Sequence, residues 1–371
     1  MTSRKQHLLH VFASFGIGGV PLRMARIINH FGVQLRHTIV ALDHNFAAAR
    51  EFTDHLEVAL LPPGEARRGM IRSLGAAVSE LRRLRPDLLI TYNWGAIEWA
   101  MANRLFPIAR QLHFEAGFGK EEATSQLRRR VLFRRWALAR AAGVVVPSRR
   151  LEELARRVWK LPLEQVVYVP NGVDVARFAD PPRDRVPGFS RRPGELVVGT
   201  VAPLRPEKNI GRLLRAFASL EGPPTARLII AGEGSERPAL VRLAAELGLG
   251  ERVVFTGQVA AEAVLGTFDV FALSSDTEQM PNALLEAMAA RRAVAAVDVG
   301  DVRDMVCEAN RGLIVACDDG RSLADAISRL LRDPAKRTEL AHGNRRRAVE
   351  MFSQERMFTA YSHIFGLDHG I

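Results

Sequence analysis

The sequence predicts an α/β protein built from two doubly wound, Rossmann-like domains. A chain of 371 residues is too long for one small core, and 47% apolar residues indicate a folded protein. Short apolar runs alternate with helix-like segments in two separate series, one over residues 7–169 and one over residues 196–351. The turn at 170–174 separates them, so we predict a first domain at 1–174 and a second at 175–352.

The first series begins with an apolar strand at 7–13, a glycine loop that contains Gly16, Gly18 and Gly19, and a helix over 20–31. Such a loop lets backbone amides approach a phosphate or a sugar. It is not the dinucleotide fingerprint, because Pro21 stands where a third glycine is required. A glycine turn that serves only tight packing explains the pattern almost as well. Further strands are predicted near 37–42, 57–61, 88–92, 110–114, 143–148 and 166–169, with a helix at 70–85.

The strand at 110–114 contains His113 near its carboxyl end, followed by Glu115. Ligands of parallel sheets gather at the carboxyl ends of strands, so His113 is a candidate catalytic residue. A single histidine at a strand end is more often structural, so the sequence leaves both roles open.

The second series begins with a strand at 196–201 and a helix at 210–220. Arg205 and Lys208 lie in the loop between them, beside the start of the helix. Cations at this place form a plausible phosphate clamp, because the positive end of the helix disfavours them unless an anion binds. Later strands are predicted at 228–231, 253–255 and 293–297, and helices at 320–332, 333–351 and 353–366.

Two glutamates, Glu278 and Glu286, lie within the strand-to-helix stretch at 274–290. Glu286 stands among apolar helix residues, where burying a carboxylate is costly unless a partner donates hydrogen bonds to it. Glu278 precedes the helix near its positive end, with Pro281 expected in the first helical turn. The alternative is that neither glutamate binds a ligand, with one at the edge of a packed helix and the other solvated in a loop. Because both glutamates cluster at one turn, we favour a binding site.

This stretch resembles the donor-site signature of retaining GT-B glycosyltransferases of family four. The resemblance lies in two glutamates with seven residues between them, the Pro281-Asn282 pair among those seven and the run Glu286-Ala-Met-Ala. It is strongest over residues 165–315. It implies the GT-B fold, in which two Rossmann-like domains face a cleft and the C-terminal helix, here within 353–371, crosses back to the first domain.

The resemblance also implies roles for single residues. Glu286 would hold the nucleotide ribose, Glu278 would contact the donor sugar and Lys208 would bind the diphosphate. Arg205 would assist Lys208, since Pro203 occupies the position of the family's arginine. His113 is the candidate for the family's acceptor-side histidine, whose own position is Ala116 here. The remaining predicted donor-binding residues are Gly18, Gly19, Val259, Met280, Pro281, Asn282, Ala283 and Leu284.

The implied function is transfer of a sugar, with retention, from a UDP- or GDP-sugar to a hydroxyl of a lipid-linked or cell-envelope glycan. We expect no metal and no other cofactor, because the sequence has no Asp-x-Asp motif. One alternative is a sugar-nucleotide epimerase of the same fold, which would turn over donor without acceptor. The other is a non-catalytic nucleotide- or membrane-binding protein, suggested by Pro203 and Ala116.

The net charge of +11 suits an anionic partner. No zinc spacing or aromatic nucleic-acid motif is present, so we expect no nucleic-acid partner. Arginines at 128–130, 134, 135 and 140 alternate with Val131, Leu132, Phe133, Trp136 and Leu138. This pattern fits a helix that lies at a membrane surface and a helix that packs within the domain equally well. On the first interpretation, residues 128–157 would bind an anionic membrane. Two cysteines and no apolar run of about 20 residues suggest a cytoplasmic protein, held peripherally at the inner face of the cytoplasmic membrane.

Overall fold

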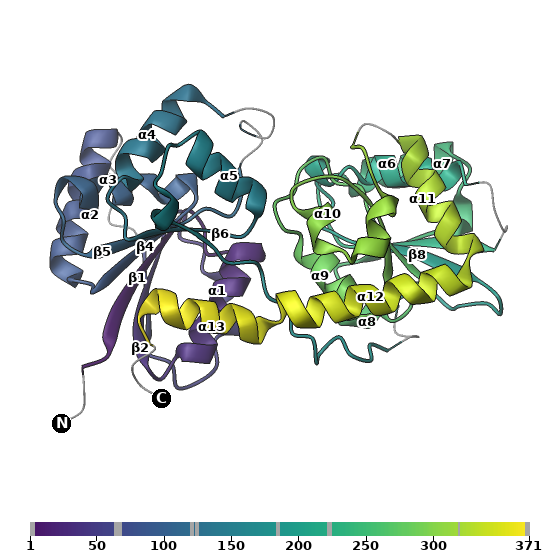
Figure 1. The fold of residues 1–371 in the computed structure, drawn as a ribbon, viewed down its shortest axis with the longest axis horizontal. Coiled ribbons are helices and arrows are strands. Elements are labelled where there is room, and N and C mark those ends of the chain that lie inside the picture. The colour runs from purple at the N-terminus through teal and green to yellow at the C-terminus, as the bar shows by residue number, and fades with distance from the viewer. Residues whose placement is uncertain are drawn as a thin grey trace. The chain divides into compact units, whose positions relative to one another are not determined.

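The computed structural model describes residues 4–62, 69–118, 122, 126–182, 186–220, 225–317 and 320–367. The chain divides into two compact units, and each unit is a parallel sheet covered by helices (Figure 1). Unit 1 consists of Met1–Val169 and Ala360–Ile371, and unit 2 consists of Pro170–Thr359. The α/β fold with two Rossmann-like domains is therefore confirmed.

The sheet of unit 1 has seven parallel strands in the order β3-β2-β1-β4-β5-β6-β7. The strand order reverses between β1 and β4, so the crevice at the carboxyl ends of these two strands is the expected ligand position. The helices α2, α3 and α4 cover one face, and α1 with the end of α13 covers the other (Figure 1). The strands are β1 Gln6–Phe12, β2 Leu35–Ala41, β3 Val58–Leu61, β4 Leu88–Tyr92, β5 Arg110–Phe114, β6 Gly143–Val146 and β7 Val166–Tyr168. The helices are α1 Gly19–Phe31, α2 Met70–Leu84, α3 Ile97–Leu105, α4 Arg128–Leu138 and α5 Arg149–Arg157, and α13 spans Gln354–Phe365.

Three buried polar rings interrupt the apolar strands of unit 1. The Nδ1 atom of His10 lies 2.9 Å from the Tyr92 hydroxyl, and its Nε2 lies 3.0 Å from Nδ1 of His37. Burial lowers the pKa of His10 well below its usual value and lowers the pKa of His37 to about 4, with a further contribution from neighbouring histidines. Both rings are therefore neutral near pH 7, so the network buries no charge, and His37 Nε2 is its one ring nitrogen without a partner among the described residues.

The sheet of unit 2 has six parallel strands in the order β10-β9-β8-β11-β12-β13, which reverses between β8 and β11. Its core is dense in Val, Ile, Leu and Ala, as expected for a parallel sheet covered on both faces. The strands are β8 Leu196–Val201, β9 Ala226–Ala231, β10 Val253–Gly257, β11 Val270–Leu273, β12 Ala293–Val297 and β13 Ile314–Val315. The helices are α6 Ile210–Ala218, α7 Arg237–Glu246, α8 Ala261–Leu265, α9 Asn282–Ala289, α10 Val302–Met305, α11 Gly320–Arg332 and α12 Pro334–Phe352.

The segment between the two sheets is attached to unit 2. The Asn171 side chain donates to the Met280 carbonyl at 2.9 Å, and the Val173 amide donates to the Phe352 carbonyl at 2.8 Å. A Cβ on Gly172 would lie 2.8 Å from the Gln354 Cα, so only glycine fits there without a shift. The division consequently falls between Val169 and Pro170, before the boundary that the sequence predicts at 174. Helix α13 begins in unit 2 and ends in unit 1, where Tyr361 stacks on Phe114 at 5.7 Å between ring centroids.

Candidate functional site

The carboxyl ends of β8 and β11 bring together two of the predicted site residues. Lys208 ends the short 3-10 helix η5, Pro206–Lys208, after β8, and Glu278 lies in the turn after β11. The Lys208 Nζ atom donates to Glu278 Oε1 at 2.5 Å, and the two side chains are 20% and 12% exposed. This ion pair lies where the strand order of unit 2 reverses, which is where ligands of such sheets bind.

Side chains that the sequence analysis did not single out hold these two loops together. Ser275 donates to Glu278 Oε1 at 2.8 Å, which fixes the carboxylate from its own turn. Asn209 caps α6 by accepting from the Arg212 amide, and its Nδ2 donates to Asp276 at 3.0 Å. Arg212 donates to the Ser274 carbonyl at 2.7 Å. Asn209 directly before a helix was the one sequence signal of this arrangement.

Glycines allow the neighbouring loops to approach the same place. A Cβ on Gly232 would lie 1.9 Å from the Ala202 carbonyl oxygen, and one on Gly300 would lie 2.5 Å from that of Glu278. Both residues have positive φ, at +147° and +56°. A side chain at either position would push the β8 or the β11 loop out of place, so these glycines keep the ion pair in position.

Glu286 lies in α9, but its surroundings differ from the sequence prediction. Its neighbours Leu285 and Ala287 are buried, whereas Glu286 itself is only partly buried. The pKa of Arg177 is raised, first by its hydrogen bond to Glu262 and further by the charge of Glu286, so this arginine lies within electrostatic reach. A partly exposed carboxylate beside a cation is available to a ligand without the full cost of burying a charge.

The start of α9 also departs from the prediction. Pro281 precedes the helix at its N-cap position, and α9 begins at Asn282, because Pro281 has an extended ψ of 121°. Asn171 donates to Asn282 Oδ1 at 3.0 Å, so the amide side chain at the helix start is held from the linker. Met280 and Leu284 are only 5% and 0% exposed, and the Leu284 amide donates to the Pro281 carbonyl at 3.2 Å, so the donor-binding roles of these two residues stay predictions.

Three further predicted donor-side residues of unit 2 are Arg205, Val259 and Ala283. Arg205 is exposed and, within the described ranges, forms no ion pair, in contrast to Lys208. Val259 follows β10 and packs partly against the core of unit 2, which leaves its backbone near the surface. The donor-binding roles of Val259 and Ala283, which is partly buried, stay predictions.

The glycine loop of unit 1 contains one closely packed glycine and two more open ones. A Cβ on Gly16 would lie 2.7 Å from Nδ2 of Asn45, so this glycine serves close packing. A Cβ on Gly18 would have Pro21 Cδ as its nearest neighbour, at 3.8 Å. Gly18 and the exposed Gly19 stand at the start of α1, directly after β1 at the point where the strand order reverses. Their amides are therefore the part of the loop that a ligand can approach.

His113 is buried in unit 1. Its side chain is 0% exposed, with Nδ1 2.9 Å from the Thr91 hydroxyl and Nε2 3.8 Å from Glu115 Oε2. Because the ring is enclosed within the β4–β5 part of the sheet, it cannot touch a substrate in this arrangement. The structural role that the sequence left open is the one that the structure supports.

Helix α4 is basic on its surface, but one of its arginines is part of the core. The Arg134 side chain is 1% exposed and donates to Glu115 at 3.2 Å and to Glu122 at 2.9 Å. Its guanidinium also lies over Trp94, Phe118 and Trp159, with centroid distances of 5.1, 5.3 and 5.1 Å. Arg134 therefore does not belong to the predicted membrane-binding surface, because its charge is paired with carboxylates inside unit 1.

Two family models match the chain, one in each half. The family described as Glycosyltransferase Family 4 matches residues 17–177, and the family described as Glycosyl transferases group 1 matches residues 185–347. The chain belongs to the group 1 glycosyltransferases. The second match contains Lys208, Glu278 and Glu286, so the ion pair and α9 lie within the region that defines this family.

Curated relatives of this group 1 glycosyltransferase include an alpha-D-kanosaminyltransferase of Streptomyces kanamyceticus, 31% identical over 56% of this chain and 55% of the relative. A lipopolysaccharide core biosynthesis glycosyltransferase of Rhizobium meliloti is 33% identical over 44% of this chain and 47% of the relative. The chain thus spans about half the length of these relatives.

Solved structures with the same GT-B fold cover the whole chain. Anabaena HepE in complex with UDP has a TM-score of 0.82 and 18% identity, covering 98% of this chain and 100% of HepE. The lipopolysaccharide outer core galactosyltransferase WaaB has a TM-score of 0.75 and 17% identity, with the same coverage. In the part of the group 1 glycosyltransferase that the structure describes, no helix is long and apolar enough to cross a membrane. That part also contains no group of three or more His, Cys, Asp or Glu residues that could hold a metal.

Proposed function

We propose that the protein transfers a sugar from a UDP- or GDP-sugar to an acceptor hydroxyl with retention of the anomeric configuration. The observation that carries this proposal is the Lys208–Glu278 ion pair at the strand-order reversal of unit 2. It supplies a cation for a diphosphate and a carboxylate for sugar hydroxyls at one place. Glu286 lies in the helix that follows the same turn and is accessible to a nucleotide ribose.

The reaction breaks the bond between the anomeric carbon and the diphosphate oxygen and forms a bond from that carbon to the acceptor oxygen. Negative charge grows on the departing diphosphate, so a fixed cation stabilises the transition state more than the ground state. In a front-face attack, the acceptor proton passes to the departing phosphate oxygen. Lys208 would then bind the diphosphate while Glu278, released from the ion pair, accepts hydrogen bonds from the sugar.

The proposal is tested by the release of nucleoside diphosphate from UDP- and GDP-sugars with and without an acceptor glycan. If the protein transfers the sugar, nucleoside diphosphate will be released only when the acceptor glycan is present. Conversion of the donor sugar without acceptor would show an epimerase instead. Binding of nucleotide without either reaction would show a non-catalytic protein.

Replacing Glu286 with alanine is expected to weaken donor binding by about 1.5–3 kcal/mol, the range for a hydrogen bond to a charged group. This corresponds to a Kd about 10- to 150-fold higher, measured by calorimetry with the nucleoside diphosphate. The free protein should keep its stability, because Glu286 is only partly buried. Glu251→Ala is the matched control, since Glu251 is exposed in the short 3-10 helix before β10, Gly250–Arg252. An unchanged Kd in a folded E286A protein would remove Glu286 from the site.

The acceptor that we propose is lipid-linked, and the protein would reach it from the cytoplasmic face of the membrane. Helix α4 exposes Leu132 and Trp136, which are 66% and 38% accessible. The same helix carries exposed cations at Arg128, Arg129 and Arg135. Each arginine near an anionic bilayer contributes about 1 kcal/mol to the free energy of membrane binding. Apolar side chains that insert into the bilayer add a contribution that salt does not screen.

We therefore expect salt-sensitive binding to vesicles that contain phosphatidylglycerol, measured by co-sedimentation. The R128S/R129S/R135S protein should bind several-fold more weakly, whereas R242S/R321S/R329S, with the same loss of charge in unit 2, should bind as the unmodified protein does. The replaced control arginines are exposed. Equal recovery on neutral and anionic vesicles, or none on either, would favour a soluble acceptor.

A further inference from the structure

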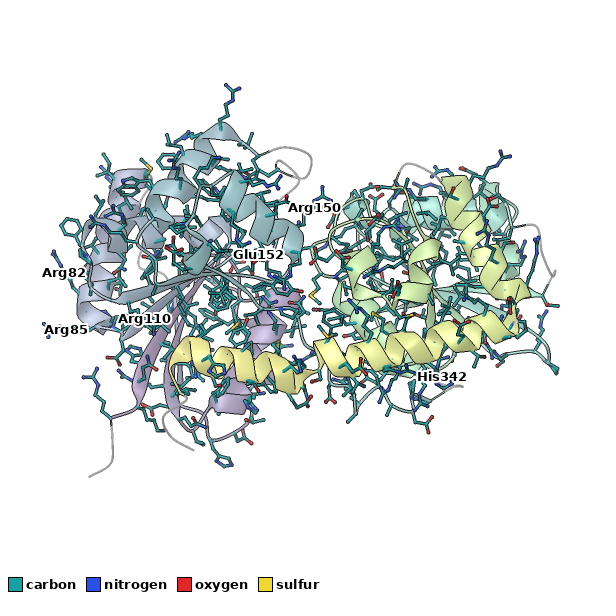
Figure 2. The ribbon with its side chains drawn as sticks, viewed as in Figure 1. Arg82, Arg85, Arg110, Arg150, Glu152 and His342 are labelled. Carbon is teal, nitrogen blue, oxygen red and sulfur yellow. The ribbon has the colours of Figure 1, made fainter. Side chains whose placement is uncertain are left out.

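A small cavity lies at the amino end of β5 in unit 1, away from the sheet edge at which ligands of parallel sheets usually bind. Its volume is about 140 Å³, and Arg104, Arg110, Gln111 and Arg140 contribute to its wall. Arg110, the first residue of β5, lies on the side of unit 1 opposite Arg150 and Glu152, which belong to the helix after the carboxyl end of β6 (Figure 2). We call this cavity the β5 pocket.

The β5 pocket carries positive charge that no acidic residue of its described lining compensates. The described residues that line it include three arginines and no acidic residue. Arg104, Arg110 and Arg140 form no ion pair within the described ranges, and the buried Arg104 Nε has no acceptor there. By contrast, the guanidinium of Arg134 in the same unit is paired with two carboxylates. Three guanidinium groups around one cavity repel each other, so an anion placed among them would be stabilised.

Gln111 provides an independent indication of a ligand. Its side chain is 5% exposed, its Oε1 accepts from the Asn103 side chain at 3.2 Å, and its Nε2 donor has no acceptor in the described part of the chain. Asn103 cannot supply one, because its Oδ1 already accepts from the amides of Ile108 and Ala109 at 3.0 and 3.1 Å. A buried amide without an acceptor is destabilising, and an oxyanion in the β5 pocket would satisfy it.

We propose that the β5 pocket binds a phosphate group, as a phosphomonoester or phosphodiester. Guanidinium groups match the oxygens of phosphate in bidentate geometry, and Gln111 adds a neutral donor. A volume of about 140 Å³ gives room for one phosphate group, and the lining residues belong to unit 1. The site is therefore separate from the donor site of unit 2, and it does not depend on the proposed reaction.

The surroundings of the β5 pocket suit a phosphate that is attached to an apolar group. Leu105 and Phe106, at the end of α3, are 51% and 48% exposed, and Trp136 of α4 is 38% exposed. The Arg104 guanidinium lies over the Trp136 ring at 5.8 Å. The phosphate could thus belong to the headgroup of an anionic lipid or to a free phosphoester, and the two sources are separable by experiment.

The test compares the full-length protein with two variants of equal charge change. R110S/R140S removes two exposed cations of the β5 pocket, and R242S/R321S removes two exposed cations from unit 2. The first measurement is the shift of Tm caused by inorganic phosphate, relative to chloride at equal ionic strength. The second is co-sedimentation with vesicles of phosphatidylglycerol and phosphatidylcholine.

We expect millimolar phosphate to raise Tm by a few degrees in the unmodified protein and in R242S/R321S, and by at least several-fold less in R110S/R140S. If R110S/R140S also loses binding to the phosphatidylglycerol vesicles, the ligand is a lipid headgroup. If its vesicle binding is unchanged while the phosphate effect is lost, the ligand is a soluble phosphoester. Equal phosphate shifts in both variants would overturn the proposal, and so would the absence of any shift in the unmodified protein.

Discussion

Replacing Lys208 with methionine is expected to lower kcat by about 100-fold or more, the usual effect of removing one preorganised group that stabilises developing negative charge. Lys208 is only 20% exposed, and its ion pair with Glu278 holds its charge at the place where the diphosphate is proposed to bind. Methionine keeps the length of the side chain but removes the charge. The measurement is single-turnover transfer with saturating donor.

Two comparisons separate the charge of Lys208 from its structural role. Arg205→Ser should reduce turnover far less, because Arg205 is exposed and unpaired within the described residues. The K208M protein leaves Glu278 without its cation, so K208M/E278Q reports how much of the loss comes from the stranded carboxylate. Similar small effects of K208M and R205S would place the diphosphate clamp elsewhere.

Replacing Arg134 with leucine is expected to destabilise the protein by about 3–5 kcal/mol, the cost of breaking a buried ion pair by removing one partner. The substitution leaves Glu115 without an arginine and Glu122 with Arg130 alone, and the two glutamate side chains are 0% and 1% exposed. It also removes the cation from among the rings of Trp94, Phe118 and Trp159. The free energy of unfolding is measured by urea denaturation at neutral pH.

Arg135→Leu is the matched control, because Arg135 is the next residue of α4 and is exposed. Its effect on stability should stay within about 0.5 kcal/mol, as for most surface substitutions. An R134L protein as stable as R135L would mean that the buried cluster contributes little and that Arg134 is an ordinary surface residue of α4.

The sequence by itself determined the fold class and most of the element positions. Parallel strands that are buried on both faces read as short apolar runs, so β4, β5, β8 and β12 have the predicted bounds. The signature from Glu278 to Glu286 indicated the family, because its spacing depends only on a strand, a turn and a helix that are close along the chain. Local patterns of this kind are visible before the chain folds.

Only the tertiary structure decided which polar residues belong to the surface and which to the core. The sequence cannot distinguish Arg134 from Arg135, but the rotation of α4 buries the first against Glu115 and Glu122 and exposes the second. Likewise, His113 stands at a strand end in the sequence, and its ring is enclosed in the sheet. The Lys208–Glu278 pair and the β5 pocket both require residues that are distant along the chain or lie on different elements, since side-chain partners are set by packing rather than by spacing.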